Sequence, residues 1–310
     1  MNTNLEIELF TQTGKPLKLK NPLLLASGTC GYVCELESFT DLSIPGGFIA
    51  KGTTLHPREG NPQPRIAETE NGMLNAIGLE NIGVEALVKE KAPVWENLGI
   101  TVFANIAGST IDEYSAVAES LEGVKGIAGV ELNISCPNVK AGGVEFGLNP
   151  KMAAEITAAV RKATTLPLIV KLSPGSGRTT EIAQAVASAG ADAITLINTF
   201  RGMAIDTSRR KPLLGNVTGG LSGPVLKPVA LAMVYEAAGI VDIPVIACGG
   251  ISSAEDAIEF IMAGASAFQV GTAFMVDPGL PSKILSSLEK FLSEQGIKDV
   301  AEIKGCARNG

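Results

Sequence analysis

Short apolar segments alternate with longer amphipathic segments along most of the chain. Eight of the short segments are apolar at nearly every position, which is typical of strands that are buried on both faces of a parallel sheet. We predict a β-strand at each of these eight segments, at residues 22–27, 47–53, 101–107, 129–135, 167–172, 193–198, 244–248 and 267–271.

The segments between these strands show the three-to-four-residue spacing of apolar positions that indicates amphipathic helices. Helices are predicted at residues 80–98, 112–121, 150–164, 179–189, 224–238, 253–263 and 280–294. Several of them are followed by a glycine, the residue that most often ends a helix, at Gly190, Gly239, Gly264 and Gly296. Eight strand–helix units in 310 residues favour a single (β/α)8 TIM barrel domain over residues 1–310, with a doubly wound α/β sheet as the alternative.

Three segments lie outside this repeat. Residues 5–10 and 15–20 alternate in part and flank a turn that contains Gly14, so they predict an N-terminal β-hairpin. Long insertions follow the second and sixth strands, at residues 54–79 and 200–222. Both are long enough to fold over the mouth of the barrel and exclude water from it.

Composition and charge narrow the class of protein. A net charge of −7 argues against a nucleic-acid surface, which needs a basic stripe. The N-terminus lacks the basic and apolar regions of a signal peptide, and no apolar run approaches the roughly 18 residues that span a bilayer. The five cysteines are scattered and fit a reducing compartment. We therefore expect a cytoplasmic protein that binds neither nucleic acid nor membrane.

Polar or glycine residues recur where the predicted strands end, which is where TIM barrels place their active sites. A lysine at a strand end would be costly in the barrel mouth without an anionic partner, and this happens twice, at Lys51 and Lys171. Glycines after the last two strands suit a phosphate group held by backbone N–H groups, although glycine can also serve only to shape a turn. The strand-end residues are Ser27, Gly28, Lys51, Gly52, Asn105, Asn133, Cys136, Lys171, Asn198, Thr199, Gly249, Gly250, Gly271 and Thr272, with Ser222 and Gly223 as further donors before the seventh helix.

The fourth strand ends in an unusual cluster of polar side chains. Asn133, Ser135, Cys136 and Asn138 follow one another there, ahead of a glycine-rich segment. A thiol in such a place is a candidate base or nucleophile. The alternative is a buried structural cysteine, but that role does not need two amides and a hydroxyl beside it. His56, the only histidine, follows the second strand and is interpreted as a loop residue.

A flavin mononucleotide (FMN) would make chemical sense of these residues. Lys171 could stabilise the anionic reduced flavin, because it supplies a charge where charge develops. The asparagines would offer amides to a flat polar substrate, and Lys51 could meet both a substrate carboxylate and the flavin. Cys136 could remove a proton from one carbon while a hydride leaves the next carbon.

Four motifs resemble those of class 1B dihydroorotate dehydrogenase, catalytic subunit: NISCPN at 133–138, NAIGL at 75–79, KGTT at 51–54 and INTFRGMAID at 197–206. The resemblance runs from about residue 5 to about residue 300 and implies oxidation of dihydroorotate to orotate in pyrimidine biosynthesis, with Cys136 as the catalytic base. It implies substrate contacts at Lys51, Asn75, Ala76, Ile77, Gly78, Leu79, Asn133, Asn198 and Thr199. It implies FMN contacts at Ser27, Lys51, Gly52, Asn105, Asn133, Lys171, Ile197, Gly223, Gly249, Gly250, Gly271 and Thr272.

The resemblance also implies a partner. The electrons would pass from FMN to NAD through an electron-transfer subunit that carries FAD and a [2Fe–2S] cluster, docked on a homodimer of this chain within a heterotetramer. The sequence itself contains no G-x-G-x-x-G dinucleotide fingerprint and no run of cluster-binding cysteines. Two features depart from the family pattern: Cys248 stands where methionine is expected, and the tail from Cys306 matches no known motif.

Three other functions remain as alternatives. A type A enzyme would pass its electrons to fumarate, but Asn198, Thr199 and the KAGG segment at 140–143 follow the type B pattern. A dihydropyrimidine dehydrogenase-like FMN barrel would differ in its substrate loops and is normally part of a longer chain. A non-redox phosphate-binding lyase or isomerase would have no need of the asparagines around Cys136.

Overall fold

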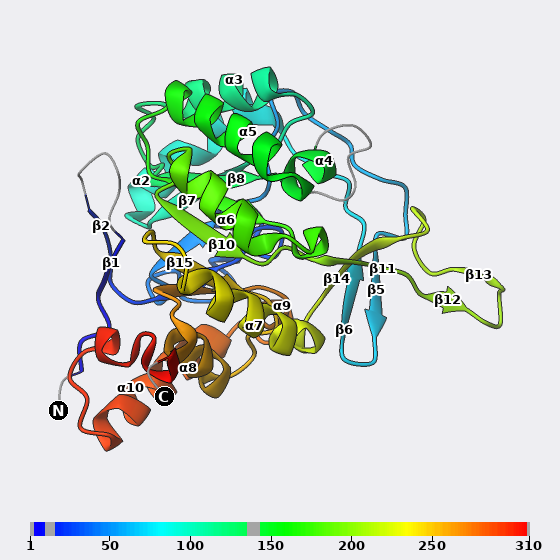
Figure 1. Ribbon diagram of the computed structural model, residues 1–310. Coiled ribbons are helices and arrows are strands. Elements are labelled where there is room, and N and C mark those ends of the chain that lie inside the picture. The colour runs from blue at the N-terminus through cyan, green and yellow to red at the C-terminus, as the bar shows by residue number, and fades with distance from the viewer. Residues whose placement is uncertain (1–2, 10–15, 135–142, 309–310) are drawn as a thin grey trace.

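Eight short parallel strands form a closed barrel, as the sequence predicts (Figure 1). The structure is a computed structural model that describes residues 3–9, 16–134 and 143–308. Each strand lies inside one of the eight predicted segments, and the last strand pairs with the first to close the barrel. In order around the barrel they are β3 (Leu23–Leu25), β4 (Gly47–Ile49), β7 (Val102–Ile106), β8 (Gly129–Asn133), β9 (Leu168–Leu172), β10 (Ala193–Leu196), β15 (Val245–Cys248) and β16 (Ala267–Val270).

Helices surround the barrel, and all seven predicted helical segments are confirmed (Figure 1). The first of them is continuous but mixed, because α1 (Gly83–Ala86) passes through the π-helical turn η2 (Leu87–Lys91) into α2 (Ala92–Leu98). The others are α3 (Ile111–Leu121), α5 (Pro150–Ala163), α6 (Thr179–Ser188), η4 (Pro224–Leu226) with α7 (Lys227–Ala238), α8 (Ala254–Ala263) and α10 (Leu280–Glu294). Further short helices are η1 (Cys34–Leu36), α4 (Gly143–Leu148), η3 (Pro174–Ser176), α9 (Thr272–Val276), η5 (Val300–Ile303) and η6 (Cys306–Arg308).

Capping side chains determine where several of these helices begin. Thr110 accepts a hydrogen bond from the backbone N–H of Glu113 at the start of α3. Asn149 does the same for α5, where Pro150 occupies the first position, and Ser253 does so for α8. Each cap satisfies a backbone donor that has no partner within the helix, so the helix begins at that residue and not a turn earlier.

The interior of the barrel changes from apolar to polar along its axis. Its N-terminal end is filled by side chains near the starts of the strands, among them Leu24, Ile49, Phe103, Ile169 and Ile246. Two residues further along, the same inward face carries fully or almost fully buried polar side chains. This follows from the strand geometry, in which every second residue points to the same face. The polar layer comprises Asn105, Glu131, Lys171, Thr195 and Gln269.

The predicted N-terminal hairpin is confirmed, and it closes the apolar end of the barrel. Strand β1 (Ile7–Leu9) pairs with β2 (Leu17–Leu19), and the buried residues Leu9 and Leu19 pack against the apolar barrel layer. In Figure 1 this hairpin and the insertions lie at opposite ends of the molecule. A substrate or cofactor must therefore enter at the polar end.

The two long insertions pair with each other, which the sequence did not predict. They form a four-stranded antiparallel sheet in the order β11 (Phe200–Gly202), β14 (Gly219–Ser222), β6 (Gly72–Asn75) and β5 (Ile66–Thr69). Strand β14 contains two glycines, so it lacks the side chains by which strands are usually identified. Glycine is required there, because a Cβ atom at Gly220 would overlap with the side chain of Thr199.

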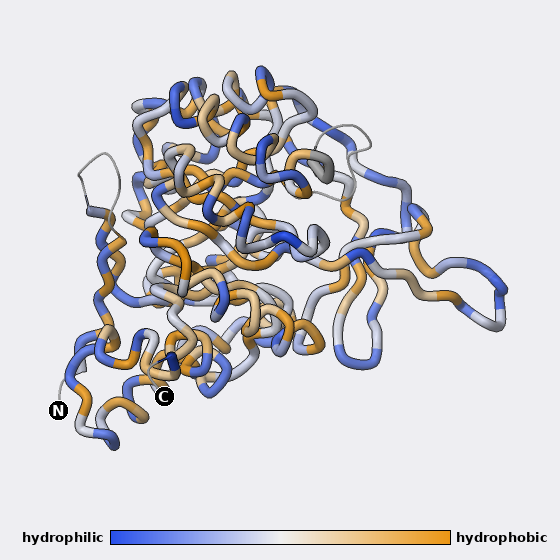
Figure 2. Tube along the Cα trace, viewed as in Figure 1, coloured by the Kyte–Doolittle hydropathy of each residue, from blue (hydrophilic) through white to orange (hydrophobic). Residues whose placement is uncertain are grey.

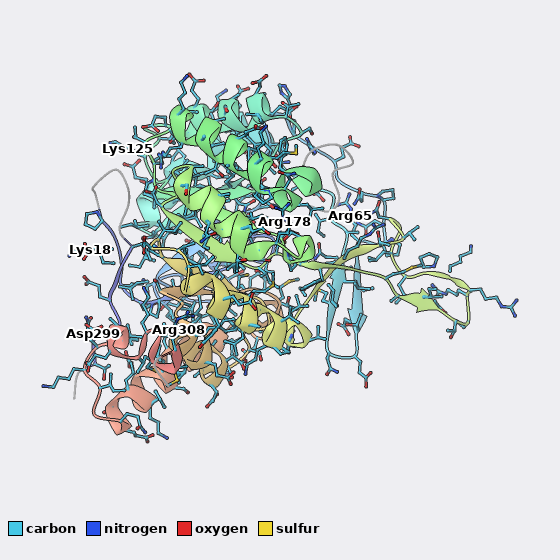
Figure 3. The ribbon with its side chains drawn as sticks, in the orientation of Figure 1. Lys18, Arg65, Lys125, Arg178, Asp299 and Arg308 are labelled. Carbon is cyan, nitrogen blue, oxygen red and sulfur yellow. The ribbon has the colours of Figure 1, made fainter. Side chains whose placement is uncertain are left out.

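A second hairpin and the C-terminal tail complete the chain. Strands β12 (Ile205–Asp206) and β13 (Lys211–Pro212) project away from the barrel, and Figure 2 shows hydrophilic residues around the end of this hairpin. The tail packs on the outside of α7, where Arg308 lies 4.4 Å from the ring centroid of Tyr235 and donates a hydrogen bond to its carbonyl oxygen (Figure 3). None of the helices in the described part of the chain is both long and apolar enough to cross a membrane.

We expect Leu19→Ala to lower the free energy of unfolding by about 2–5 kcal/mol, because it leaves a cavity in the layer that closes the barrel. The measurement is urea unfolding of the purified protein. The matched control is Lys18→Ala on the same strand, since Lys18 lies on the outer side of the hairpin (Figure 3) and makes only an exposed ion pair with Glu6. The control is expected to stay within about 0.5 kcal/mol of wild type. Equal effects of the two substitutions would contradict the role of the hairpin as a plug.

Candidate active site

A cavity of about 320 Å³ opens at the polar end of the barrel. This volume lies in the range of small-molecule sites, about 300–1,000 Å³. Both the strand ends and the insertion sheet contribute to its walls. The predicted residues that line it are Ser27, Lys51, Gly52, Asn75, Ile77, Gly78, Leu79, Asn105, Asn133, Lys171, Ile197, Asn198, Thr199, Gly223, Gly249, Gly250, Gly271 and Thr272.

Three residues singled out in the sequence are not among the described lining residues of the cavity. Cys136 lies outside the described residues. Ala76 is fully buried behind the cavity wall, where its N–H donates to the carbonyl oxygen of Arg65. His56 is exposed and does not line the cavity, as expected for a loop residue.

A fully buried carboxylate, that of Glu131, organises the polar layer below the cavity. Its Oε1 atom accepts a hydrogen bond of 2.8 Å from Nδ2 of Asn105 and lies 3.8 Å from Nζ of Lys171. Its Oε2 atom accepts hydrogen bonds from Nε2 of Gln269 at 2.7 Å and from Oγ1 of Thr195 at 3.0 Å. Four strands in addition to β8 thus supply a partner to one carboxylate, which is the condition under which a buried charge is tolerated.

The Lys171 side chain is only 7% exposed, yet it remains an ammonium group. Burial by itself lowers the pKa of Lys171, but the nearby Cys248 and Glu131 outweigh burial and raise that pKa above its ordinary value. The Nζ atom lies 3.3 Å from Oε1 of Gln269 and 3.8 Å from Sγ of Cys248. Burial raises the pKa of the Cys248 thiol. Lys171 therefore brings a positive charge to the floor of the cavity.

Asn105, which lines the same cavity, has a hydrogen-bond acceptor without a partner among the described residues. Its side chain is fully buried, and its Oδ1 atom has no hydrogen-bond partner among the described residues. A Cβ atom at Gly52, another cavity residue, would lie 3.1 Å from this oxygen. Leaving a buried acceptor unsatisfied costs about 1–3 kcal/mol, so a bound ligand that supplies a donor here would gain stability.

Two asparagines from different strands meet at the side of the cavity. Nδ2 of Asn198 donates a hydrogen bond of 3.2 Å to Oδ1 of Asn133, and Oδ1 of Asn198 accepts one from the backbone N–H of Thr199. The hydroxyl group of Tyr114 donates to the carbonyl oxygen of Asn133 and so holds the end of β8. Asn75 also lines the cavity, and its side chain donates to the carbonyl oxygen of Gly220. The insertion sheet therefore brings Asn75 to the same cavity as the strand-end amides.

Residues 75–79, the predicted substrate segment, are held from behind by the loop before β5. The backbone N–H of Asn61 donates to the carbonyl oxygen of Ile77, and its side chain donates to that of Ala76. Arg65 forms an ion pair with Glu80, next to the segment, and is labelled beside the insertion sheet in Figure 3. The sequence analysis missed both Asn61 and Arg65, because nothing local connects them to a segment that lies about a dozen residues away.

The glycines predicted to cradle a phosphate all line one end of the cavity. Gly250 has φ +81°, and a Cβ atom there would overlap with the backbone nitrogen of Lys227, so only glycine fits. Lys227 is tied to α8 by an ion pair with Asp256 at 2.6 Å. Across this end, Oγ1 of Thr272 donates a hydrogen bond of 2.8 Å to Oγ of Ser222. The result is a glycine-lined corner where backbone without a Cβ atom faces the cavity, as a phosphate site requires.

Glu131, Thr195 and Gln269 are not among the residues predicted from the sequence, because the barrel rule points to residues at or after the strand ends. A signal was present. Each lies inside an otherwise apolar strand, and Glu131 is two residues before Asn133, so both face the same side of β8. A charged residue at an inward position of a buried strand is rare enough to indicate a functional layer.

Comparison with known proteins gives the family. Residues 10–292 match the sequence model for dihydroorotate dehydrogenase. Proteins named "Dihydroorotate dehydrogenase B (NAD(+)), catalytic subunit" are similar to this chain: that of Citrifermentans bemidjiense is 50% identical and that of Trichlorobacter lovleyi 52% identical. Both alignments cover 93% of this chain and 95% of the relative. These comparisons confirm the resemblance to class 1B.

The fold is similar to that of a solved structure as well. A dihydroorotate dehydrogenase from Eimeria tenella, crystallised with ferulenol, superposes with a TM-score of 0.82 at 22% identity, over 99% of this chain and 89% of that one. At this identity the match concerns the fold alone. The sequence matches, which span nearly the whole chain, carry the assignment: this chain belongs to the dihydroorotate dehydrogenase family.

Proposed function

We propose that this chain oxidises dihydroorotate to orotate in pyrimidine biosynthesis and that residues 1–310 form a single FMN-binding barrel domain. The observation that carries the proposal is the cavity floor. There the Lys171 ammonium group reaches the same ligand site as the Oδ1 atom of Asn105, which has no hydrogen-bond partner among the described residues. A cation and a bare acceptor suit the polar edge of a flavin ring, which offers a carbonyl oxygen and an N–H group. The glycine-lined corner suits its phosphate.

The residues present therefore fit FMN. The phosphate would be held at the glycine-lined corner by Gly223, Gly249, Gly250, Gly271 and Thr272. The ring would be held by Ser27, Lys51, Gly52, Asn105, Asn133, Lys171 and Ile197. When bound, FMN would supply the acceptor for the hydride that leaves the substrate.

The remaining residues would bind the substrate and move its proton. Lys51 would pair with the substrate carboxylate, since no described residue forms an ion pair with its ammonium group. Amide groups of Asn75, Asn133 and Asn198 would hold the flat ring, together with Thr199 and the segment 77–79. Sγ of Cys136 would take the proton from the carbon next to the one that loses the hydride. The insertion sheet lies at the mouth and would limit the entry of water.

We infer that the electrons leave through a partner. The relatives are named as NAD(+)-dependent and as catalytic subunits, and this chain covers 95% of their length. An electron-transfer subunit with FAD and a [2Fe–2S] cluster, docked on a homodimer of this chain in a cytoplasmic heterotetramer, would connect FMN to NAD.

The purified chain is expected to be yellow and to release FMN on denaturation. Anaerobic addition of dihydroorotate should bleach the visible flavin spectrum, because the substrate transfers its hydride to the cofactor. Orotate alone, which has no hydride to give, serves as the control and should shift the spectrum without bleaching it. A colourless protein that takes up no added FMN would rule the proposed function out.

Replacement of Cys136 by alanine should leave FMN binding intact and slow the reduction of FMN by dihydroorotate by ~10²-fold or more, the scale of a lost general base. Serine should restore part of the rate, with an optimum at higher pH, because a hydroxyl group ionises less readily than a thiol. Stopped-flow absorbance measures these rates. Cys306→Ala is the matched control, since this cysteine lies exposed in the C-terminal tail and should leave the rate unchanged. Wild-type kinetics in Cys136→Ala would place the base elsewhere.

The isolated chain should reduce NAD poorly with dihydroorotate as donor, and addition of the partner subunit should make NAD reduction efficient. The reason is that NAD would otherwise have to reach the flavin face that the substrate occupies. Steady-state assays with NAD and with fumarate, before and after the partner is added, measure this. Efficient reduction of either acceptor by the isolated chain would contradict the proposed electron route.

A further inference from the structure

Three of the four groups that contact Glu131 also reach the cavity. Asn105, Lys171 and Gln269 line it, whereas Thr195, which also contacts the carboxylate, does not. Glu131 itself is 0% exposed and cannot touch a ligand. A change at this carboxylate can therefore act on a bound ligand only through side chains that contact both.

The first way in which Glu131 can act on a bound ligand is through the orientation of the Asn105 amide. A carboxylate can only accept hydrogen bonds, so Glu131 must face the NH₂ group of Asn105, and the 2.8 Å bond shows that it does. The oxygen of the same amide is consequently turned away from Glu131 and left without a described partner. Glu131 thus determines that Asn105 offers the cavity an acceptor and not a donor.

The second way in which Glu131 can act on a bound ligand is through the charge of Lys171. A buried amine without a counter-charge releases its proton. Among the described residues, the titratable groups that face Lys171 include Glu131 on β8, Cys248 on β15 and Cys30 after β3. The pKa of Cys30 is raised to about 12 by burial. Glu131, whose Oε1 atom lies 3.8 Å from Nζ, is the carboxylate among these groups.

We propose that Glu131 is the positioning residue of the cofactor site. It holds the Lys171 ammonium group and the Asn105 amide oxygen side by side. There they can bind the adjacent carbonyl and N–H groups on the pyrimidine edge of the flavin ring. This inference rests on the proposed FMN site. Its chemical consequence is that the flavin edge meets a permanent positive charge, which stabilises the anionic reduced flavin. The reduction of FMN then consumes two electrons and one proton from the solvent.

Glu131→Gln tests the proposal, because glutamine keeps the shape and removes the charge. Without the carboxylate, burial is no longer offset by the charge that lies 3.8 Å from Nζ, so the pKa of Lys171 falls. Reduction of FMN then takes up a second proton, on Lys171, at pH values above that lowered pKa. The measurement is the midpoint potential of the holoenzyme between about pH 7 and about pH 9.5, below the ordinary lysine pKa. Wild type should take up one proton per two electrons throughout, and Glu131→Gln should rise to two. The dissociation constant of FMN should also rise by about tenfold or more.

Two further variants separate charge from packing. Thr195→Val removes a hydrogen bond to the same carboxylate but no charge, so it should keep the wild-type proton count. The double variant Glu131→Gln/Lys171→Met leaves no uncompensated buried charge, so it keeps the test open if the single variant does not fold. The double variant should show a lower potential than wild type, since the cation is gone.

The outcomes are distinct. A folded, FMN-loaded Glu131→Gln protein with the wild-type proton count and FMN affinity overturns the inference, and so does a double variant with the wild-type potential. In both cases a wild-type protein that binds FMN and is bleached by dihydroorotate leaves the proposed function standing. A wild-type protein that binds no FMN removes the proposed function and this inference together.

Discussion

The buried carboxylate of Glu131 imposes the constraint on which the upper half of the barrel depends. A charge with no exposed surface is stable only if its oxygen atoms are hydrogen-bonded and its charge is compensated. Here the donors come from Asn105, Thr195 and Gln269, and the compensation comes from Lys171. These residues lie on five different strands, so the closed barrel is the arrangement that satisfies the carboxylate.

The lower half of the barrel is apolar, and it closes one end of the barrel. The same inward face that carries polar groups near the strand ends carries Phe103, Ile169 and Ile246 near the strand starts. The hairpin residues Leu9 and Leu19 cover this layer and keep water from the apolar end. Because one end is sealed, the electrostatic field of Lys171 acts on a site that opens in one direction only, where the effective dielectric constant is lower than in water.

The insertion sheet supplies what the barrel strands cannot. Asn75 ends a strand outside the barrel, yet it lines the same cavity as Asn133 on β8 and Asn198 just after β10. The pairing of β6 with β14 joins segments about 145 residues apart, and it places Asn75 opposite Gly220 in the insertion sheet. The close approach of Gly220 to Thr199 explains why a strand so poor in side chains lies at this position. The cavity is therefore lined both by the barrel, which carries most of the proposed cofactor residues, and by a sheet that adds proposed substrate residues.

The sequence by itself determined the eight strands, the helices between them, the hairpin and most of the cavity residues. These features depend on local periodicity, and the barrel rule converts a position at a strand end into a position at the mouth. Only the tertiary structure decided which polar side chains meet. Glu131 finds Asn105 at a separation of 26 residues, Thr195 at 64 and Gln269 at 138, and no local pattern relates such positions. The pairing of the two insertions was undetermined for the same reason, because strand pairing depends on which backbones the barrel brings together.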